Sequence, residues 1–286
     1  MKKKILLITG TVILLISIVL FNTFIVNPSQ LHVRQVNITS NKIDSNLDGL
    51  KIAYFADIHY GFTSNELIEE SIDRINLYDP DIIIFGGDLF DSLYEKGISE
   101  LDKNYLVEIL SKLESKYGKY AVIGNHDHEA YDSPELYLDI ITKAGFKPLV
   151  NENIQIYVDN NSFINIVGLD SSSYATLYTS TAFSSLNNSA YTFVVTHTPD
   201  SFDEISGYPF DYCLAGHSHG GQIYLPVINL LTRAFGYQNH LRGITTINSK
   251  ILDITTGIGT TKIKARLNAD SEIVVYQLNQ KKTEVQ

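Results

Sequence analysis

Residues 50–88 read LKIAYFADIHYGFTSNELIEESIDRINLYDPDIIIFGGD, and this stretch decides the fold. The segments 50–57 and 80–88 are apolar runs, and each is predicted to form a buried strand. Between them, residues 63–78 show the apolar spacing of a helix, with Thr63 or Ser64 as its cap. A strand, a helix and a second strand in this order are typical of an α/β fold with a parallel sheet.

The same rhythm continues on the C-terminal side. We expect a helix over 99–116, a strand over 119–127 and a helix over 133–145, with Ser133 as cap and Pro134 at its first position. Beyond residue 147 the predicted strands have shorter spacers, and the later ones have a hairpin-like arrangement. They are expected at 153–159, 162–170, 190–198, 211–219, 221–226, 243–248, 250–257 and 272–278. A βαβ half is therefore followed by a more β-rich half, with no internal repeat and no Pro/Gly-rich linker between them.

The N-terminus reads MKKKILLITGTVILLISIVLFNTFIVNPS. The run Ile5–Val26 has no charge for about 22 residues, which is long enough to cross a bilayer as a helix. A cleaved signal peptide would have a shorter apolar core followed by small residues, whereas this run ends with Phe21, Phe24 and Val26. We therefore favour an uncleaved anchor over a cleaved signal or a buried core helix. Because Lys2–Lys4 precede the run, the bulk of the chain is expected outside the cytoplasm, attached to the cell membrane by a single span.

These features divide the chain into three parts. Residues 1–30 are the predicted anchor, residues 31–48 a polar connecting segment, and residues 49–280 the folded domain. Within the connecting segment, the alternating run LHVRQVNI (31–38) predicts a first edge strand. The last residues, NQKKTEVQ, are expected to be frayed.

The composition narrows the class of protein. The chain has 286 residues, enough for one large domain with a substantial core and an appendage. A formal net charge of −10 argues against nucleic acid as a partner, although it leaves room for local basic patches. The single cysteine, Cys213, excludes an intrachain disulfide and is expected to be a small core residue, which leaves the redox compartment open.

Side chains that can bind metals follow the predicted strands. In a parallel sheet, the carboxyl ends of the strands meet at one edge, so residues far apart in sequence can gather there. Taken singly, each such residue is best explained as a turn or a cap. Metal-binding residue types at the ends of several successive strands are not explained in this way, because burying polar groups without partners is energetically costly. The residues are Asp57, His59, Asp88, Asp91, Asn125, His126, Asp127, His197, His217 and His219.

These residue types favour particular metals and a particular reaction. Carboxylates, imidazoles and one amide, with no thiolate, suit Mn, Fe or Zn. There are too many candidates for one tetrahedral site, which suggests two ions that share a bridging ligand. Two such ions can clamp the attacking and leaving oxygens of a phosphoryl displacement. No nucleophilic Ser or Cys is placed at the clusters, so no phosphoenzyme is expected.

Five blocks in a fixed order strengthen this interpretation: Asp57-x-His59, Gly87-Asp88-x-x-Asp91, Gly124-Asn125-His126-Asp127, His197-x-Pro199 and Gly216-His217-Ser218-His219. This ordered set resembles the calcineurin-like metallophosphoesterases, and the match over residues 50–221 is highly specific. The downstream segments GHSHGGQIYLP and TTGIGTTKIKARLN resemble the bacterial membrane-anchored branch typified by YkuE and YaeI. That branch often has threonine at the position of Ser218.

The resemblance implies a four-layer α/β/β/α sandwich and assigns roles to the clustered residues. It implies two divalent cations, one held by Asp57, His59 and His219, the other by Asn125, His197 and His217, with Asp88 bridging both. His126 would contact the phosphate and protonate the leaving group, Asp127 would orient His126, and Asp91 would support a ligand. His32, His128 and His240 receive no role and are expected to be surface histidines.

The expected activity is hydrolysis of a phosphomonoester or phosphodiester by a hydroxide that bridges the two cations. The anchor brings the site close to the bilayer, which favours a lipid-linked or cell-envelope substrate. Some members of the branch act on UDP-2,3-diacylglucosamine, but that step is cytoplasmic, whereas Lys2–Lys4 predict the outer face. A non-catalytic binding module is the alternative from another class, and every ligand position being filled argues against it. A 5'-nucleotidase would need an additional C-terminal domain. The protein is expected to be monomeric.

Overall fold

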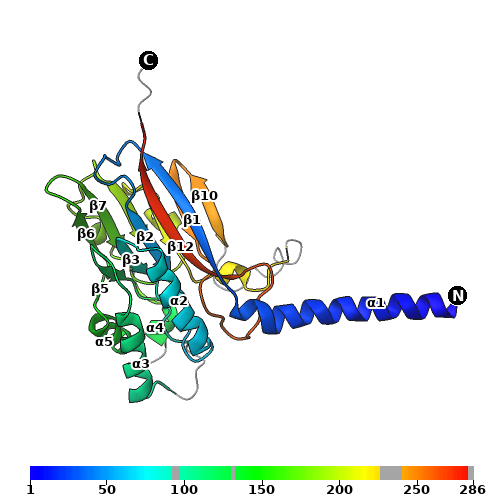
Figure 1. The fold of residues 1–286 in the computed structure, drawn as a ribbon. Coiled ribbons are helices and arrows are strands. Elements are labelled where there is room, and N and C mark those ends of the chain that lie inside the picture. Colours follow the sequence, from blue (N-terminus) through cyan, green and yellow to red (C-terminus); the bar gives the residue numbers. More distant parts are fainter. Residues whose placement is uncertain (92–96, 130–132, 226–239, 283–286) are drawn as a thin grey trace.

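Two six-stranded sheets form the centre of the molecule in this computed structural model, which describes residues 1–91, 97–129, 133–225 and 240–282 (Figure 1). The first sheet has the order β1-β12-β2-β3-β4-β5 and the second the order β10-β11-β9-β8-β7-β6. Neighbours β2 to β5 are parallel, as are β11, β9, β8 and β7, so each sheet has a parallel centre. The first sheet consists of β1 (Leu31–Ser40), β2 (Lys51–Phe55), β3 (Ile82–Phe85), β4 (Lys119–Ala121), β5 (Phe146–Pro148) and β12 (Ser271–Gln280). The second consists of β6 (Glu152–Tyr157), β7 (Phe163–Gly168), β8 (Tyr191–Val195), β9 (Tyr212–Ala215), β10 (Gly243–Ile247) and β11 (Lys250–Ile254).

Helices cover the outer face of each sheet, and the predicted four-layer α/β/β/α sandwich is confirmed. On β2, Ala53 and Phe55 pack against α2 (Asn65–Leu77), α3 (Glu100–Ser111) and α5 (Glu135–Lys143). Their neighbours Ile52 and Tyr54 point the other way and pack against the second sheet. The shorter α6 (Thr179–Ala182) and α7 (Ser201–Ile205) cover the outer face of that sheet. This alternation follows from the period of two along a strand.

Several boundaries differ from those predicted. Ser64, not Thr63, caps α2, because its hydroxyl accepts the N–H of Leu67. The helix α5 starts at Glu135, so Pro134 is its N-cap residue rather than its first helical residue. The predicted strand over 119–127 ends at Ala121, and residues Asn125–Glu129 form the one-turn helix α4 instead.

Other differences concern strands. The predicted connecting segment 31–48 contains β1, which pairs with β12 over its whole length and forms the expected edge of the first sheet. The first sheet therefore begins with Leu31, close behind the N-terminal helices. The short strand β5 was not predicted. The expected strand over 221–226 is reduced to a single bridge between Ile223 and Leu267, and Pro226 lies outside the described residues. Cys213 is buried, as predicted.

A polar network joins the two sheets across the layer between them. Asp253 on β11 accepts hydrogen bonds from the hydroxyls of Tyr212 and Tyr276 at 2.9 and 2.8 Å. Arg34 on β1 donates to both oxygens of Asp253 at 2.8 and 3.0 Å and to Glu272 at 2.9 Å. Burial alone would lower the pKa of Arg34, but the bonds to the two carboxylates raise it above its ordinary value. We call these five residues the inter-sheet network.

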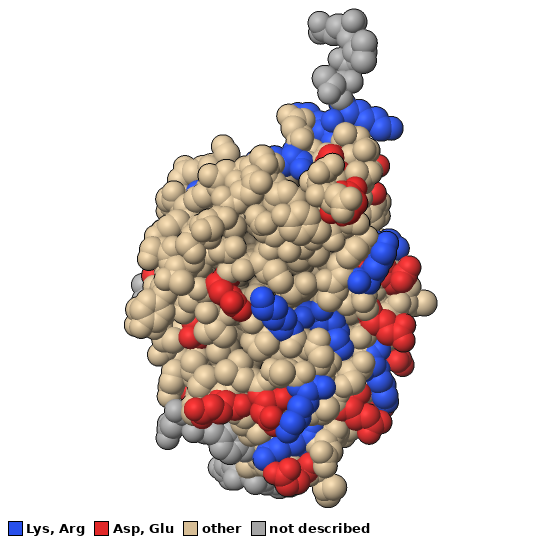
Figure 2. Space-filling model, turned by 90° about the vertical axis from the view of Figure 1, so that its left-hand side faces the viewer, with Lys and Arg blue, Asp and Glu red and all other residues tan. Residues whose placement is uncertain are grey.

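The N-terminal helix α1 (Lys2–Phe21) extends away from the sandwich with no buried residue (Figure 1). Together with η1 (Asn22–Val26) and η2 (Asn27–Ser29) it is long and apolar enough to span a membrane, with a mean hydropathy of 2.6. Its end contacts the domain through Arg266, whose N–H donates to the Thr23 carbonyl at 2.9 Å and whose own carbonyl accepts from Asn27 at 3.0 Å. On the face turned away from α1, basic and acidic side chains are interspersed (Figure 2).

Candidate metal centre

The candidate ligands lie at the carboxyl ends of strands from both sheets. Asp57 and His59 follow β2, Asp88 follows β3, and the remaining ones follow β4, β8 and β9. Five of the predicted ligands have left-handed backbone conformations, which are uncommon outside glycine: Asp57 (φ 56°), His59 (φ 48°), Asp88 (φ 57°), His217 (φ 65°) and His219 (φ 49°). Such conformations persist where the surrounding structure enforces them, and they cluster at functional sites.

Close backbone packing enforces this geometry at two glycines. A Cβ on Gly124 would collide with the carboxylate of Asp88, and a Cβ on Gly257, which has a φ of 68°, would collide with the side chain of Asp57. Only glycine lets the backbone approach these carboxylates so closely. The carboxylates are therefore fixed in place before any ligand binds.

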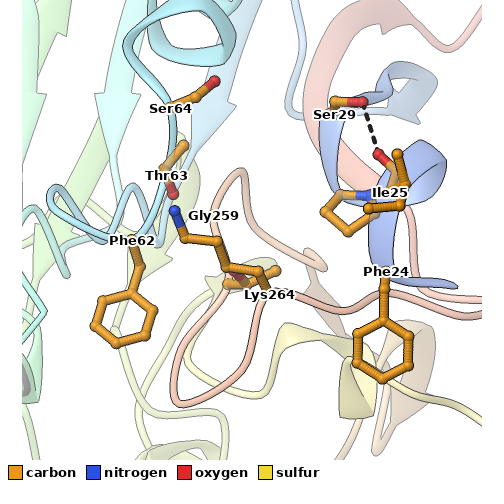
Figure 3. Close-up of a pocket in the computed structure, with 10 residues that line it drawn as sticks. Phe24, Ile25, Ser29, Phe62, Thr63, Ser64, Gly259 and Lys264 are labelled. Carbon is orange, nitrogen blue, oxygen red and sulfur yellow. Dashed lines mark hydrogen bonds between the residues drawn. The ribbon is translucent and has the colours of Figure 1, made fainter.

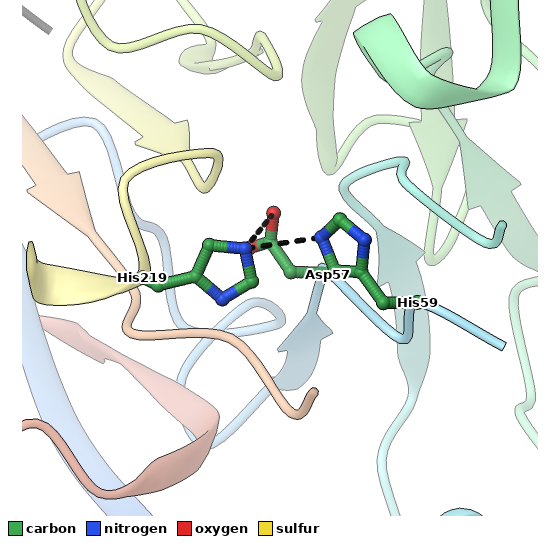
Figure 4. Close-up of side chains that lie close together, drawn as sticks. All are labelled: Asp57, His59 and His219. Atoms are coloured by element: carbon green, nitrogen blue, oxygen red, sulfur yellow. Dashed lines mark hydrogen bonds and ion pairs between the residues drawn. The ribbon is translucent and has the colours of Figure 1, made fainter. Parts of the chain in front are cut away.

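The first group consists of Asp57, His59 and His219, all buried (Figure 4). One ligand atom from each lies within 4.8 Å of the others. The Nε2 atoms of His59 and His219 are only 3.0 Å apart. Two ring nitrogens at this distance must share either a proton or a cation, because two lone pairs facing each other repel.

The second group consists of Asp88, His197 and His217, and it touches the first. Oδ2 of Asp88 lies 3.0 Å from Nε2 of His197 and 3.5 Å from Nε2 of His59. Asp88 therefore stands between the two groups, where a bridging carboxylate would stand. Asn125, predicted to belong to the second group, is also buried.

Unsatisfied acceptors show that these residues fit cations. Oδ2 of Asp57 and Oδ1 of Asn125 are buried and have no hydrogen-bond partner among the residues that the structure describes. A buried acceptor without a partner is destabilising, and a cation would remove that cost. Carboxylate, amide and imidazole ligands suit a hard or borderline divalent ion.

The pKa values of the buried histidines also indicate that these residues can hold cations. Burial alone would lower the pKa of His197, but the carboxylate of Asp88 raises it to about 10. Burial, together with the charge of His197, lowers the pKa of His217 to about 3. Burial and the neighbouring His59 also lower the pKa of His219 well below its ordinary value. Without cations the carboxylates are balanced by a protonated His197, whereas His217 and His219 are already neutral, the state that binds a metal.

Hydrogen bonds to backbone carbonyls orient two of the imidazoles at Nδ1, and a carboxylate lies close to Nδ1 of a third. Nδ1 of His197 lies 2.8 Å from the Gly86 carbonyl, and Nδ1 of His219 lies 3.1 Å from the Gly259 carbonyl. Nδ1 of His59 lies 3.1 Å from Asp91, the residue predicted to support a ligand. Such partners fix the tautomer and leave Nε2 for a metal.

Comparison with known proteins identifies the family. Residues 50–221 match the family of calcineurin-like phosphoesterases. The chain belongs to this family. Calcineurin-like phosphoesterases hydrolyse phosphoric esters at a dinuclear divalent metal centre, and the two groups are the candidate ligands for it here.

Three relatives of the calcineurin-like family place the chain within it. The metallophosphoesterase YkuE of Bacillus subtilis is 30% identical over 88% of this chain and 86% of its own length. The phosphodiesterase YaeI of Escherichia coli is 28% identical over 80% of this chain and 82% of its own. The UDP-2,3-diacylglucosamine pyrophosphatase LpxG of Chlamydia trachomatis is 25% identical over 81% of this chain and 84% of its own. The expected similarity to the YkuE and YaeI branch is therefore confirmed.

His126 is more accessible than several of the other clustered histidines. Its side chain is 14% exposed, whereas those of His59 and His197 are fully buried. Its backbone N–H donates to Oδ1 of Asp88 at 2.9 Å, and its ring lies edge-on to His59 with centroids 4.9 Å apart. Its Nδ1 lies 3.4 Å from Oε2 of Glu129. This ring therefore borders both groups from the solvent side.

Asp127 differs from its predicted role as the residue that orients His126. Its oxygens accept backbone N–H groups of Asp88 and Leu89 at 2.8 Å and of Gly124 at 2.9 Å. These bonds fasten the loop after β3 to the loop after β4, so Asp127 holds the backbone that carries Asp88. Glu129, three residues after His126 on α4, is the carboxylate close to the His126 ring.

Sequence reasoning also missed a second histidine on α4. His128 was expected at the surface but is buried, with Nε2 2.8 Å from Asp170 and its ring stacked on Tyr174 at 5.1 Å. Asp170 follows β7 and so obeys the same rule that identified the other strand-end residues. His32 is exposed, as predicted, and His240 pairs with Asp203 at 3.2 Å.

Proposed function

We propose that this chain is a dinuclear metal-dependent phosphoesterase that works at the membrane surface. Asp57, His59 and His219 would hold one divalent cation, Asn125, His197 and His217 the other, and Asp88 would contact both. The observation that carries this proposal is the contact of the two groups at Asp88, together with the unpartnered buried oxygens of Asp57 and Asn125. Two cations supply Lewis-acid activation of water and neutralise charge at phosphorus when bound.

The protein's own residues would perform the remaining steps. The buried groups exclude bulk water, which strengthens their interaction with a phosphate. His126 borders the groups from the accessible side and would donate a ring proton to the leaving oxygen. Glu129, close to its Nδ1, would hold the orientation of the ring. Asp127 would keep Asp88 in position through the backbone bonds described above.

Metal removal tests this proposal. Chelation with EDTA should abolish hydrolysis of p-nitrophenyl phosphate or bis(p-nitrophenyl) phosphate, and added Mn, Fe or Zn should restore it. Metal analysis of the reconstituted protein should find two ions per chain. Full activity in a thoroughly chelated sample would overturn the dinuclear mechanism, and a single bound ion would overturn the division into two groups.

The physiological ester is proposed to be a lipid-linked or cell-envelope phosphate. The support is the anchor, whose end packs against the domain, and the relative LpxG, which is named for a substrate with two acyl chains. The basic flank Lys2–Lys4 supports a domain outside the cytoplasm. A reporter fused after Gln286 should therefore be active only on that side. A UDP-2,3-diacylglucosamine pyrophosphatase activity is the second candidate, and a substrate panel with Mn that includes this compound separates the two.

A further inference from the structure

A pocket lies between the end of the anchor and the first metal group. We propose that this pocket binds the hydrocarbon part of a membrane lipid phosphoester, whose phosphate then reaches the metal centre sideways from the bilayer. The proposal rests on the proposed function for its chemistry, and it adds the class of substrate and the place where its chain binds. The pocket has a volume of about 180 Å³. It is lined by Phe24, Ile25, Pro28, Ser29, Phe62, Thr63, Ser64, Gly259, Thr260 and Lys264.

The inner wall of the pocket consists of residues that are hydrogen-bonded to the ligands of the first group. The backbone N–H groups of Phe62 and Thr63 both donate to the carbonyl of His59, at 3.0 and 3.1 Å. On the neighbouring loop, Gly259 accepts from Nδ1 of His219 at 3.1 Å and donates its N–H to the carbonyl of Asp57 at 2.7 Å. Every ligand of the first group is thus bonded to a residue that lines the pocket or adjoins it. A molecule in the pocket lies one residue away from the candidate metal centre.

The outer wall is the membrane anchor itself. Phe24 and Ile25 line the pocket and are still 47% and 60% exposed, so they face both the pocket and the surroundings of the anchor. In Figure 3, Phe24, Ile25 and Ser29 stand on one side and Phe62, Thr63 and Ser64 on the other. Because the anchor is apolar and would lie in lipid at this point, the opening beside it leads into the bilayer interface rather than into bulk water.

The loop next to the pocket combines basic residues with an exposed apolar residue, a composition that suits a membrane interface. It reads Thr261-Lys-Ile-Lys-Ala-Arg-Leu267, and its Ile263 is 48% exposed between two lysines. Lys264 extends from this loop into the space between the anchor and the segment Phe62–Ser64 (Figure 3). In a chain of net charge −10, a lysine at this mouth suits an anionic head group, while the phenylalanines suit the adjoining chain.

The occupant that fits best is therefore a single-chain anionic lipid phosphoester. Apolar residues and an ammonium group occur together in this pocket, which suits an amphipathic ligand better than a soluble nucleotide. A second copy of this chain, placing its own anchor against the opening, is the competing occupant. The labelling experiment separates these two occupants, because the anchor of a second copy would exclude the lipid probe from the pocket.

Photo-cross-linking tests occupancy without requiring catalysis. Full-length, metal-free protein in nanodiscs would be irradiated with a hexadecyl phosphate probe that carries a diazirine in its chain. The probe should label the segments 24–29, 62–64 and 259–264. The substitution Ser29→Trp would fill the pocket and should lower labelling at least about fivefold. Ser111→Trp is the matched control, since both hydroxyls bond to the carbonyl four residues earlier at exposed positions.

Kinetics with a matched pair of esters then measures the contribution of the chain. Hexadecyl p-nitrophenyl phosphate and methyl p-nitrophenyl phosphate share the phosphodiester and the leaving group and differ only in the alkyl chain. Ser29→Trp should lower the ratio of kcat/KM for the long over the short ester about tenfold, the value of burying about two methylene groups. Lys264→Glu should lower the same ratio by a smaller factor. Lys147→Glu, an exposed lysine on β5, should leave it unchanged.

The outcomes separate this inference from the proposed function. Labelling confined to α1, or a ratio that does not change in Ser29→Trp and Lys264→Glu, would overturn the lipid pocket. Specific labelling of the pocket without Mn-dependent hydrolysis of either ester or of p-nitrophenyl phosphate would overturn the proposed function and leave the pocket standing.

Discussion

Two clusters of polar and charged side chains in this protein differ in whether their hydrogen-bonding groups are satisfied. This difference distinguishes a structural cluster from a functional one. In the inter-sheet network, Asp253 receives four hydrogen bonds, and the guanidinium of Arg34 lies against two carboxylates. In the metal centre, Asp57 and Asn125 each keep a buried oxygen without a partner, and imidazole nitrogens face each other at 3.0 Å. The first cluster is complete within the chain. The second becomes complete only when something binds, and for this reason we assign function to it alone.

The largest effects on activity are expected from substituting Asn125 and His126, two adjacent residues with different proposed roles at the candidate metal centre. Asn125→Ala removes a proposed ligand, so the content of bound metal should fall together with the activity. His126→Ala should keep both ions and lower kcat roughly 10²–10⁴-fold, because a general acid is lost. The loss should be greatest for alkyl esters, since p-nitrophenolate departs without a proton. Metal analysis and rates on an alkyl and an aryl ester measure both effects. Equal loss of metal in the two variants would show that His126 is also a ligand.

A comparable change in the inter-sheet network should affect stability instead. Asp253→Ala leaves the half-buried Arg34 with one partner fewer and two buried tyrosine hydroxyls without their acceptor. We expect a loss of about 3–5 kcal/mol in the free energy of unfolding, with metal content retained in the folded fraction. Urea unfolding in detergent measures it. Asp139→Ala, which removes a partner from an exposed pair on α5, is the control and should cost less than about 1 kcal/mol. If Asp253→Ala abolished metal binding in folded protein, the two clusters would not be independent.

Removing one hydrogen bond from the inter-sheet network tests the contrast between the two clusters on a smaller scale. Tyr276→Phe removes one donor to the Asp253 carboxylate and should cost about 1.5–3 kcal/mol, the usual range for a bond to a charged group. Tyr54 provides the matched control because its buried hydroxyl has no hydrogen-bond partner. Tyr54→Phe should therefore be neutral or slightly stabilising. Thermal unfolding of the two variants side by side gives the difference, and equal destabilisation would contradict this account of the network.

The smallest expected effect concerns a residue that supports a ligand. Asp91 lies 3.1 Å from Nδ1 of His59, and Asp91→Asn removes the charge that favours this imidazole as a ligand. The affinity for Mn at the first group should fall about 10–100-fold, with little change in protein stability. Mn titration of the metal-free protein measures it, and Asp73→Asn on the exposed face of α2 serves as control. An unchanged affinity would mean that Asp91 has only a structural role.

The candidate ligands could be picked out from the sequence because they follow a local rule, whereas the backbone contacts that hold them in place could not. A chemically unusual residue at the end of an apolar run is visible in the sequence, and Asp57, Asp88 and His197 were found in this way. The left-handed conformations of Asp57 and Asp88 were not visible, since nothing local demands them. They depend on glycines that approach from other loops, such as Gly257 beside Asp57.

Partners distant in the chain were missed for the same physical reason. Arg34 pairs with a residue 219 positions away, and no periodicity in either segment indicates the pair. The backbone hydrogen bonds of Asp127 were not visible in the sequence, where the family resemblance implied only that it orients His126. In α4 consecutive side chains point in different directions, so Asp127 faces the backbone of the β3 loop while His126 borders the site. The alternation of strands and helices in the first half, by contrast, followed from periodicity, whereas the packing of two sheets in four layers was implied by the family resemblance.

The attachment of the anchor has a consequence for how the enzyme responds to its membrane. Every residue from Lys2 to Ser40 except Gln30 belongs to a helix or a strand, and Arg266 fastens the junction to the domain. The fully buried guanidinium of Arg266 also bonds to the carbonyls of Gly257 and Gly259, beside the first metal group. A helix in a thinner bilayer tilts to match the hydrocarbon thickness. With no slack at the junction, a domain anchored as proposed would tilt with the helix, so bilayer thickness would set the height of the candidate metal centre above the lipid head groups.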